Sequence, residues 1–182
     1  GAAHTKIDAK TLENDSNISG HKSLEMHPGR SNSRNSGSIF TGENGLITVQ
    51  GTFLNIGTVY SHGNLRIQGA LPSARLQNQG RVKAFGLLDI RDFKEFQQEG
   101  SVRQKSADGH LNVFVENFFQ TGKYAHNRHT PGLLSSKGTL HLQGQNYRNN
   151  GTIRAHSTAE VHVSDFQNFE EGLISFLANA KM

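Results

Sequence analysis

The sequence predicts an all-β fold, a parallel β-helix of about six coils, in a chain of 182 residues. One short motif recurs at intervals of 20 to 29 residues, and a second short motif alternates with it. A nearly fixed period of this size is typical of solenoids, in which one small unit stacks on the next. No stretch of about ten to twelve residues shows the 3.6-residue apolar period of a helix. The repeating unit is therefore built from strands.

The first motif consists of a large apolar residue, an amide two positions later, a glycine, and then Val, Ile or Tyr. Its copies cover residues 53–59, 76–82, 96–102, 118–124 and 147–153, and a last copy with a displaced aromatic, Phe169, covers 169–174. The glycines are 23, 20, 22, 29 and 21 residues apart. Glycine marks positions of tight turning or close backbone approach, so each copy predicts a strand, a corner and a further short strand.

The second motif has the form Gly-x-apolar-x-apolar-Gln-Gly. It covers residues 45–51, 63–69 and 138–144, with weaker copies at 86–90, 109–113 and 159–163. Apolar and polar residues alternate with period two, which predicts a strand with its aliphatic side chains inside. From residue 53 onward the two motifs alternate strictly, so every coil contains at least two short strands.

Stacking of the coils predicts two buried columns of side chains. The first column contains Val59, Val82, Val102, Tyr124, Ile153 and Ile174, and the second contains Phe53, Leu76, Phe96, Phe118 and Tyr147. Each such side chain contributes roughly 1.5–3 kcal/mol when it is fully buried. The amides precede each glycine by two residues, at Asn55, Asn78, Gln98, Gln120 and Asn149. They either form hydrogen bonds from coil to coil or stabilise the turn locally.

The ends of the chain differ from its middle. Residues 1–38 are polar, rich in Gly, Ser and Asn, and show no apolar period, so we expect an irregular N-terminal segment that is disordered or caps the first coil. The β-helix is expected over residues 39–182. Because the chain begins with Gly and residues 173–177 still resemble a strand, we expect a piece of a longer protein.

Composition limits the possible functions. The chain has no cysteine, which excludes disulfides and cysteine-based metal sites. It has no run of 18 apolar residues, so no transmembrane helix is predicted. The net charge is +4, and residues 1–52 carry five basic and five acidic side chains. The excess of positive charge therefore lies in residues 53–182, within the predicted β-helix.

Basic residues recur at one outward position, directly after the buried residue of the first motif. This column comprises Tyr60, Lys83, Arg103, Ala125, Arg154 and Ser175. Neighbouring coils are about 4.8 Å apart, where two like charges in water repel by roughly 1 kcal/mol, which long side chains can relieve. The column suits an acidic polysaccharide, a lipopolysaccharide or another anionic surface. The alternative is a solvated face neutralised by nearby Asp and Glu. Nucleic acid is not expected, since these strands show no aromatic–basic stacking platform.

The longest excursion between copies covers residues 123–132 and adds three candidate ligand-binding residues, His126, Arg128 and His129. Long loops on a rigid scaffold often carry binding groups. His126 and His129 could share a metal, but no carboxylate lies near them, and a plain exposed loop is the favoured interpretation.

The second motif has its own outward column, which comprises Arg66, Asp89, Asn112, His141 and His162. Arg66 beside Asp89 predicts a cross-coil ion pair of small value. His141 over His162 is either a pH-sensitive pair or an ordinary polar contact.

A catalytic role needs clustered carboxylates, as in β-helical polysaccharide lyases and glycosidases. The candidates Asp89, Asp92, Glu95 and Glu99 form one linear run that is interleaved with Arg91 and Lys94. No carboxylate recurs at matching positions of neighbouring coils. We therefore predict no catalytic residue, no metal site and no cofactor, with a polysaccharide-active enzyme as the alternative.

The two motifs together resemble the repeats of filamentous haemagglutinin-like exoproteins, over about residues 45–176. The resemblance implies a long right-handed parallel β-helix from a two-partner-secretion adhesin or the stalk of a contact-dependent inhibition toxin. It further implies secretion through an outer-membrane transporter partner to the bacterial surface, where the partner is a receptor on a host or neighbouring cell or an acidic glycan. Secretion domains of this family usually carry Asn-Pro motifs and this chain has none, so the segment resembles stalk or receptor-facing repeats.

Overall fold

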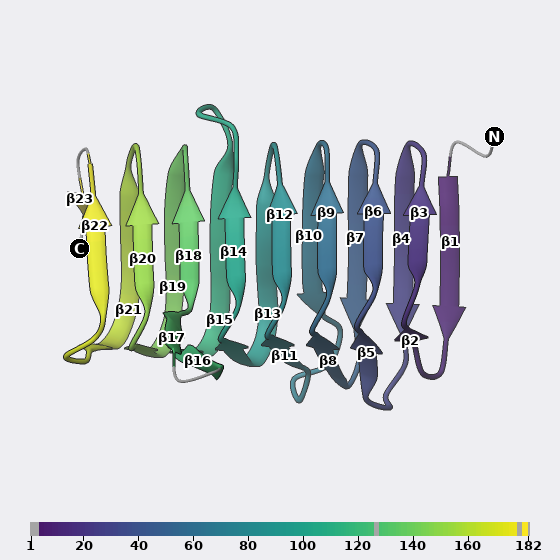
Figure 1. Ribbon diagram of the computed structural model, residues 1–182, viewed down its shortest axis with the longest axis horizontal. Coiled ribbons are helices and arrows are strands. Elements are labelled where there is room, and N and C mark those ends of the chain that lie inside the picture. The colour runs from purple at the N-terminus through teal and green to yellow at the C-terminus, as the bar shows by residue number, and fades with distance from the viewer. Residues whose placement is uncertain (1–3, 126–127, 178–179, 182) are drawn as a thin grey trace.

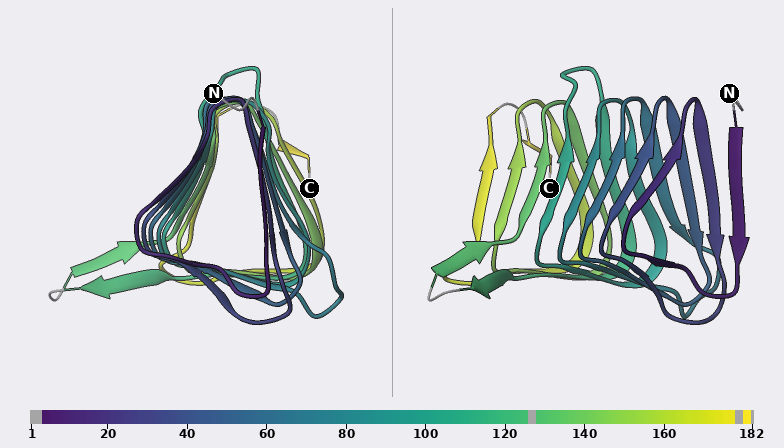
Figure 2. Two further views of the ribbon diagram at one scale, coloured as in Figure 1. Left: turned by 90° about the vertical axis from the view of Figure 1, so that its right-hand side faces the viewer. Right: turned by 45° about the vertical axis from the view of Figure 1, so that its right-hand side comes forward.

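Short strands joined at tight corners wind into a β-solenoid of about eight turns with a triangular cross-section (Figures 1 and 2). The computed structural model describes the backbone of residues 4–125, 128–177 and 180–181, and their side chains except those of 123–125, 128–129 and 180–181. Apart from one hairpin, the strand pairings between described residues are parallel, from each coil to the next. The predicted fold class is confirmed, with about eight turns in place of six.

Each turn has three faces. Face one comprises β1 (His4–Ala9), β4 (Ser23–Pro28), β7 (Asn44–Val49), β10 (Asn64–Gly69), β23 (Ala180–Lys181) and the first parts of the long strands β13 (Leu88–Gln98), β15 (His110–Gln120), β19 (Thr139–Asn149) and β21 (Ala159–Asn168). Face two comprises the second parts of these long strands with β2 (Glu13–Asn14), β5 (Ser33–Asn35), β8 (Thr52–Asn55) and β11 (Arg75–Asn78). Face three is a separate eight-stranded sheet formed by β3 (Asn17–Gly20), β6 (Ser38–Thr41), β9 (Thr58–Ser61), β12 (Arg81–Ala84), β14 (Ser101–Gln104), β18 (Leu133–Ser136), β20 (Thr152–Ala155) and β22 (Leu173–Phe176).

The pairing registers confirm most of the two predicted columns and correct one member of the first. Val59, Val82 and Val102 are followed by Leu134 instead of Tyr124, and then by Ile153 and Ile174. The second column is as predicted from Phe53 to Tyr147, and its next member is Phe166. Phe169, which we expected to mark the last copy, is 46% exposed, because Asn168 aligns with Asn149 and the motif therefore begins at Phe166.

An inserted hairpin explains why Tyr124 is not in its column. β16 (Gly122–Ala125) and β17 (Arg128–Pro131) pair antiparallel and project from the corner between faces two and three (Figure 2). The coil resumes at Gly132, whose N–H donates to the Thr121 carbonyl oxygen at 2.8 Å. Without the insertion the chain would read Gln120-Thr121-Gly132, which is the amide-x-Gly pattern of the other coils. Gly132, and not Gly122, is therefore the repeat glycine of this turn.

The N-terminal segment is not irregular over its described residues. β1 to β6 pair in register with the coils that follow, and Leu12, Leu24 and Met26 are buried in the common core. The expectation of irregular structure for residues 1–38 was wrong, because a segment with few apolar residues still forms strands when a neighbouring coil pairs with it. In the solenoid, its backbone groups and amides are satisfied by the neighbouring coil, which a single-sequence pattern does not reveal.

The buried amides form coil-to-coil hydrogen bonds. Each side-chain Nδ2 donates to the next amide oxygen along Asn14, Asn35, Asn55, Asn78 and Gln98, at 2.7–2.8 Å. The series stops at the hairpin, where the Nε2 of Gln120 donates to the carbonyl oxygens of Gly132 and Thr152 instead. Local turn bonds occur as well, since the Gly151 N–H donates to Oδ1 of Asn149 at 3.1 Å. Both interpretations of these amides are correct.

Candidate functional site

The outer surface of face three is the candidate site, and its strands determine its charge. None of the described strands of this face contains Asp or Glu, whereas they contribute Arg81, Lys83, Arg103 and Arg154. In each four-residue strand the second and fourth side chains point into the core and the third points outward. This alternation places the basic side chains on the solvent side.

Strand pairing brings the predicted column together with one correction. Tyr60, Lys83 and Arg103 are consecutive partners, and the next outward residue is Ser135, followed by Arg154 and Ser175. The expected member Ala125 is wrong because it belongs to the inserted hairpin. One uncharged coil therefore separates Arg103 from Arg154.

Two lysines that sequence reasoning missed complete a basic cluster, defined here as Lys83, Arg103, Lys105, Lys137 and Arg154. Lys105 and Lys137 follow the outward position by two residues, at the corner where β14 and β18 end. Burial, and then the charges of Arg103, Lys83 and Lys137, lower the pKa of Lys105. Within the described part of the chain, none of the five forms an ion pair with a carboxylate.

Two hollows border Arg103 and Arg154 of the basic cluster. A small one of about 240 Å³ lies among Arg103, Lys105, Leu133, Lys137 and Arg154. A longer groove of about 690 Å³ follows the corner beside the hairpin, with Arg81, Arg103 and Arg154 along it and one carboxylate, Glu99. The Nε atom of Arg103 is buried and has no hydrogen-bond partner. A cationic groove that crosses several coils can hold an extended anionic chain.

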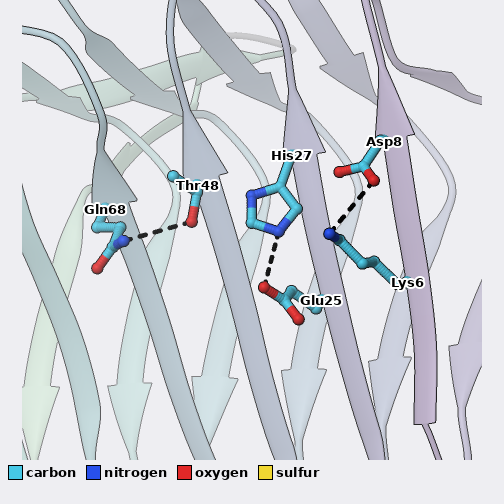
Figure 3. Close-up of polar contacts among 6 residues, drawn as sticks. All are labelled: Lys6, Asp8, Glu25, His27, Thr48 and Gln68. Atoms are coloured by element: carbon cyan, nitrogen blue, oxygen red, sulfur yellow. Dashed lines mark hydrogen bonds and ion pairs between the residues drawn. The ribbon is translucent and has the colours of Figure 1, made fainter.

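Face one shows the opposite pattern, because its charged side chains are paired. Lys6 and Asp8 lie 3.4 Å apart, and Nε2 of His27 lies 2.8 Å from Oε1 of Glu25 (Figure 3). The Gln68 amide donates to the hydroxyl of Thr48 at 3.3 Å on the same surface (Figure 3). Between described residues, ion pairs with carboxylates therefore occur on face one, and the basic cluster of face three forms none.

Asp89 is the most deeply buried of the described residues that form ion pairs on face one. The predicted pair with Arg66 is present at 2.9 Å, and Arg91 lies 2.8 Å from the same oxygen. The carboxylate is completely buried, with its Oδ1 unpartnered, so the pair is not the minor exposed contact that we expected. His141 lies opposite Glu160 and not opposite His162, which corrects the proposed histidine pair.

The four candidate catalytic carboxylates do not converge. Asp89 is buried on face one, and Asp92 lies at the following bulge with a φ of 62°. Glu95 is on face two, where the Gln97 amide donates to it, and Glu99 lies at the next corner. No group of three or more potential metal ligands occurs among the described residues.

The hairpin residues are only partly described. His126 lies outside the described residues, and Arg128 and His129 belong to β17 with their side chains likewise outside the description. Thr130 and Pro131 of the same strand line the long groove. The hairpin thus borders the cationic groove.

Sequence reasoning also missed a group of outward aromatic rings next to the basic cluster, named here the aromatic patch. It consists of Phe40, Tyr60, His62 and Phe85, with ring centroids 5.0–5.9 Å apart. Because Phe40, Tyr60 and Phe85 line one hollow together with Lys83 and Lys105, the expectation that this face has no aromatic–basic platform was wrong. The sequence does contain a signal for this patch, because three consecutive coils each carry an aromatic residue at or near the outward position, namely Phe40, Tyr60 and Phe85.

The comparisons with known proteins agree with the repeat pattern. The family model described as haemagglutinin repeat matches residues 3–83, 105–144 and 121–165, which together make up more than half of the chain. Comparison with curated proteins gave no match, and comparison with solved structures gave none either. Among the described residues there is no helix long and apolar enough to cross a membrane.

Proposed function

The chain belongs to the haemagglutinin-repeat family, and we propose that it is a non-enzymatic adhesin or stalk segment that attaches to acidic glycans through face three. The partner is an acidic glycan on a host or neighbouring cell. Secretion to the bacterial surface through an outer-membrane transporter is the route that this family implies.

The distribution of charge carries this proposal. Face three has a basic cluster and no carboxylate on its described strands, while the carboxylate ion pairs between described residues lie on face one. Cations without partners raise the local concentration of anions and favour their binding. Lys105 supports the proposal further, since its pKa is lowered by burial and by neighbouring positive charge that a bound anion would neutralise.

Linear geometry supports a polymer as the ligand. The groove crosses strands of consecutive coils, which are about 4.8 Å apart, so cationic groups recur along the solenoid axis. The scattered carboxylates Asp89, Asp92, Glu95 and Glu99 give no support to a polysaccharide-cleaving enzyme. Attachment without turnover is therefore the favoured activity.

The test is retention of the purified chain on immobilised acidic and neutral polysaccharides, with released reducing ends assayed in the same wells. We expect retention on acidic polysaccharides without cleavage. The Lys83/Arg103/Arg154→Ala triple variant should bind at least about tenfold more weakly, because each exposed ion contact contributes up to about 1 kcal/mol.

The matched control is Lys22/Arg34/Lys94→Ala, which removes three exposed positive charges from elsewhere on the solenoid. This variant should retain binding. Equal losses in the two triple variants would show that only net charge matters, and cleavage would contradict the adhesin role.

A further inference from the structure

Three rings of the aromatic patch and two lysines of the basic cluster surround one hollow on the outer surface of face three. The hollow has a volume of about 540 Å³ and is lined by Phe40, Tyr60 and Phe85, by Lys83 and Lys105, and by Ser38, Ile39 and Thr58. Small-ligand sites are commonly of this size, mostly apolar, with a few polar groups that fix orientation. Phe85 is 45% exposed, so its ring is accessible.

The rings hold one another in place. Tyr60 lies 5.5 Å from Phe40 and 5.0 Å from His62, and the Tyr60 hydroxyl is 3.1 Å from Nδ1 of His62. His62 in turn stacks on Phe85 at 5.9 Å. The platform is therefore assembled from three consecutive coils and is ordered before a ligand arrives, which lowers the entropic cost of binding.

We infer that the aromatic patch is a subsite that stacks a pyranose ring of the ligand while Lys83 and Lys105 bind an anionic substituent of that ring. This inference rests on the proposed attachment to acidic glycans and adds a specificity: the face recognises acidic sugars and discriminates against polyanions without a sugar ring. A carboxylate and a sulfate satisfy the same two ammonium groups, so the shared chemistry is an anionic pyranose.

The ring spacing excludes a site in which a planar base is intercalated between two neighbouring rings of the patch. Centroid separations of 5.0–5.9 Å leave no slot between neighbouring rings for a third planar ring. A ligand must instead lie across the patch and contact several rings from outside. A sugar presents C–H groups on a broad face and can do so while its chain continues along the axis toward Arg103 and Arg154.

The test compares four probes in solution: an oligogalacturonate, a dextran sulfate, inorganic polyphosphate and an oligothymidylate. The variants are Phe85→Ala, Phe85→Tyr as the variant that keeps a ring, and Phe169→Ala as a control phenylalanine of equal exposure, at 46%. We expect Phe85→Ala to weaken binding of at least one of the two sugar probes roughly tenfold, as truncation of an aromatic anchor does. Polyphosphate binding should change less than twofold, and Phe85→Tyr and Phe169→Ala should bind as the unmodified chain.

The two sugar probes distinguish the sources of negative charge. If Phe85→Ala weakens the binding of oligogalacturonate alone, the anionic group of the ligand is a carboxylate. If it weakens the binding of dextran sulfate alone, that group is a sulfate. A second readout is an upfield NMR shift of sugar ring protons on binding, which stacking on Phe85 produces and charge pairing alone does not.

Failure of the stacking inference and failure of the proposed function give different results in this experiment. If both sugar probes bind and Lys83/Arg103/Arg154→Ala weakens them while Phe85→Ala does not, the stacking subsite is overturned and attachment to acidic glycans stands. If Phe85→Ala weakens only oligothymidylate, the patch binds bases and the inference is wrong. If neither sugar probe binds the unmodified chain, the proposed function fails, and the inference with it.

Discussion

Asn55 illustrates how single buried amides join three coils. It is completely buried, accepts a hydrogen bond from Asn35 and donates one to Asn78, both at 2.7 Å. A buried polar group that loses its partner costs about 1–3 kcal/mol. The series thus couples each coil to both neighbours through side chains as well as through the backbone.

Asn55→Ala should lower the free energy of unfolding by about 2–4 kcal/mol, because it leaves a buried donor and a buried acceptor unpaired. Equilibrium denaturation monitored by circular dichroism measures this. Asn44→Ala is the control, since its 3.1 Å bond with Asn64 is exposed and should contribute less than about 0.5 kcal/mol. Equal effects of the two substitutions would show that the buried series adds nothing specific.

Lys105 is the residue whose ionisation reports on the basic cluster. Its pKa is lowered first by burial and then by Arg103, Lys83 and Lys137. The charged lysine therefore disfavours the folded state at neutral pH. As the pH rises through the lowered pKa toward 10.5, that penalty is relieved and the contribution of Lys105 to stability becomes more favourable.

A bound acidic glycan should raise the pKa of Lys105, because an adjacent anion favours the ammonium form. An NMR titration of the labelled lysine side chains, with and without glycan, measures the shift. A neutral glycan of the same length should leave the pKa unchanged. An unchanged pKa with the acidic glycan bound would place the ligand away from this lysine.

At the scale of the element, the corner glycines set how closely the coils can stack. A Cβ atom at Gly80 would lie 2.0 Å from the carbonyl oxygen of Gly57 and 2.5 Å from that of Ile56. Both contacts are to backbone of the preceding coil, which cannot move without disturbing the strands on either side. Close approach explains the glycine here, and no positive φ is involved.

Gly80→Ala should destabilise the chain by about 2 kcal/mol or more, since the coil must shift to admit the methyl group. Thermal and chemical unfolding measure the change. Gly86→Ala is the matched control, because its nearest neighbour is the side-chain amide oxygen of Asn64, at 2.4 Å, which can move at the cost of one exposed hydrogen bond from the Leu87 N–H, and the expected loss is below about 1 kcal/mol. A tolerated alanine at residue 80 would show that the stack adapts at this corner.

The hairpin is an element added to a complete coil. Thr121 and Gly132 are already joined by a backbone hydrogen bond at its base, and β18 continues the sheet of face three from β14. Its removal therefore leaves the amide-x-Gly corner intact. The hairpin contributes to the edge of the long groove through Thr130 and Pro131.

Deletion of residues 122–131 should leave a folded solenoid whose stability changes by less than about 1 kcal/mol, because closing a short surface loop costs little. Far-ultraviolet circular dichroism and denaturation measure this. Weaker glycan retention by the folded deletion variant would support roles for His126, Arg128 and His129. An insoluble or unfolded product would show that the hairpin is integral to the coil.

At the scale of the whole molecule, the solenoid separates its charges by face. Paired charges on face one, and cations on face three that form no ion pair with a described carboxylate, give the elongated body one attractive side for anions. Exposed charges are screened by salt over about 10 Å at 0.1 M ionic strength, so attachment through this face is sensitive to salt. The body itself is held by buried columns and backbone pairing, which salt affects little.

Retention on acidic glycans should fall at least about tenfold between roughly 0.05 and 0.5 M salt, with the fold retained. Binding isotherms at several salt concentrations measure the slope. The Lys83/Arg103/Arg154→Ala variant should show a shallower slope than the unmodified chain. Identical slopes would mean that other cations of the molecule carry the attachment.

The sequence alone determined the fold class, the inward residues of most coils and the basic outward position. Each follows from local patterns, since side chains alternate in a strand and glycines recur at every corner. Lys83, Arg103 and Arg154 could be placed in one column because each directly follows a residue that must be buried.

Only the tertiary structure decided which residues far apart in the sequence meet. It assigned Gly132 as the glycine of the interrupted coil, included the polar N-terminal segment in the stack, and buried Asp89 between Arg66 and Arg91. It also assembled Phe40, Tyr60, Phe85, Lys83 and Lys105 around one hollow. The physical reason is that contacts between coils depend on the register of pairing across 20 or more residues, and an insertion or a weakly apolar coil changes that register without changing any local pattern.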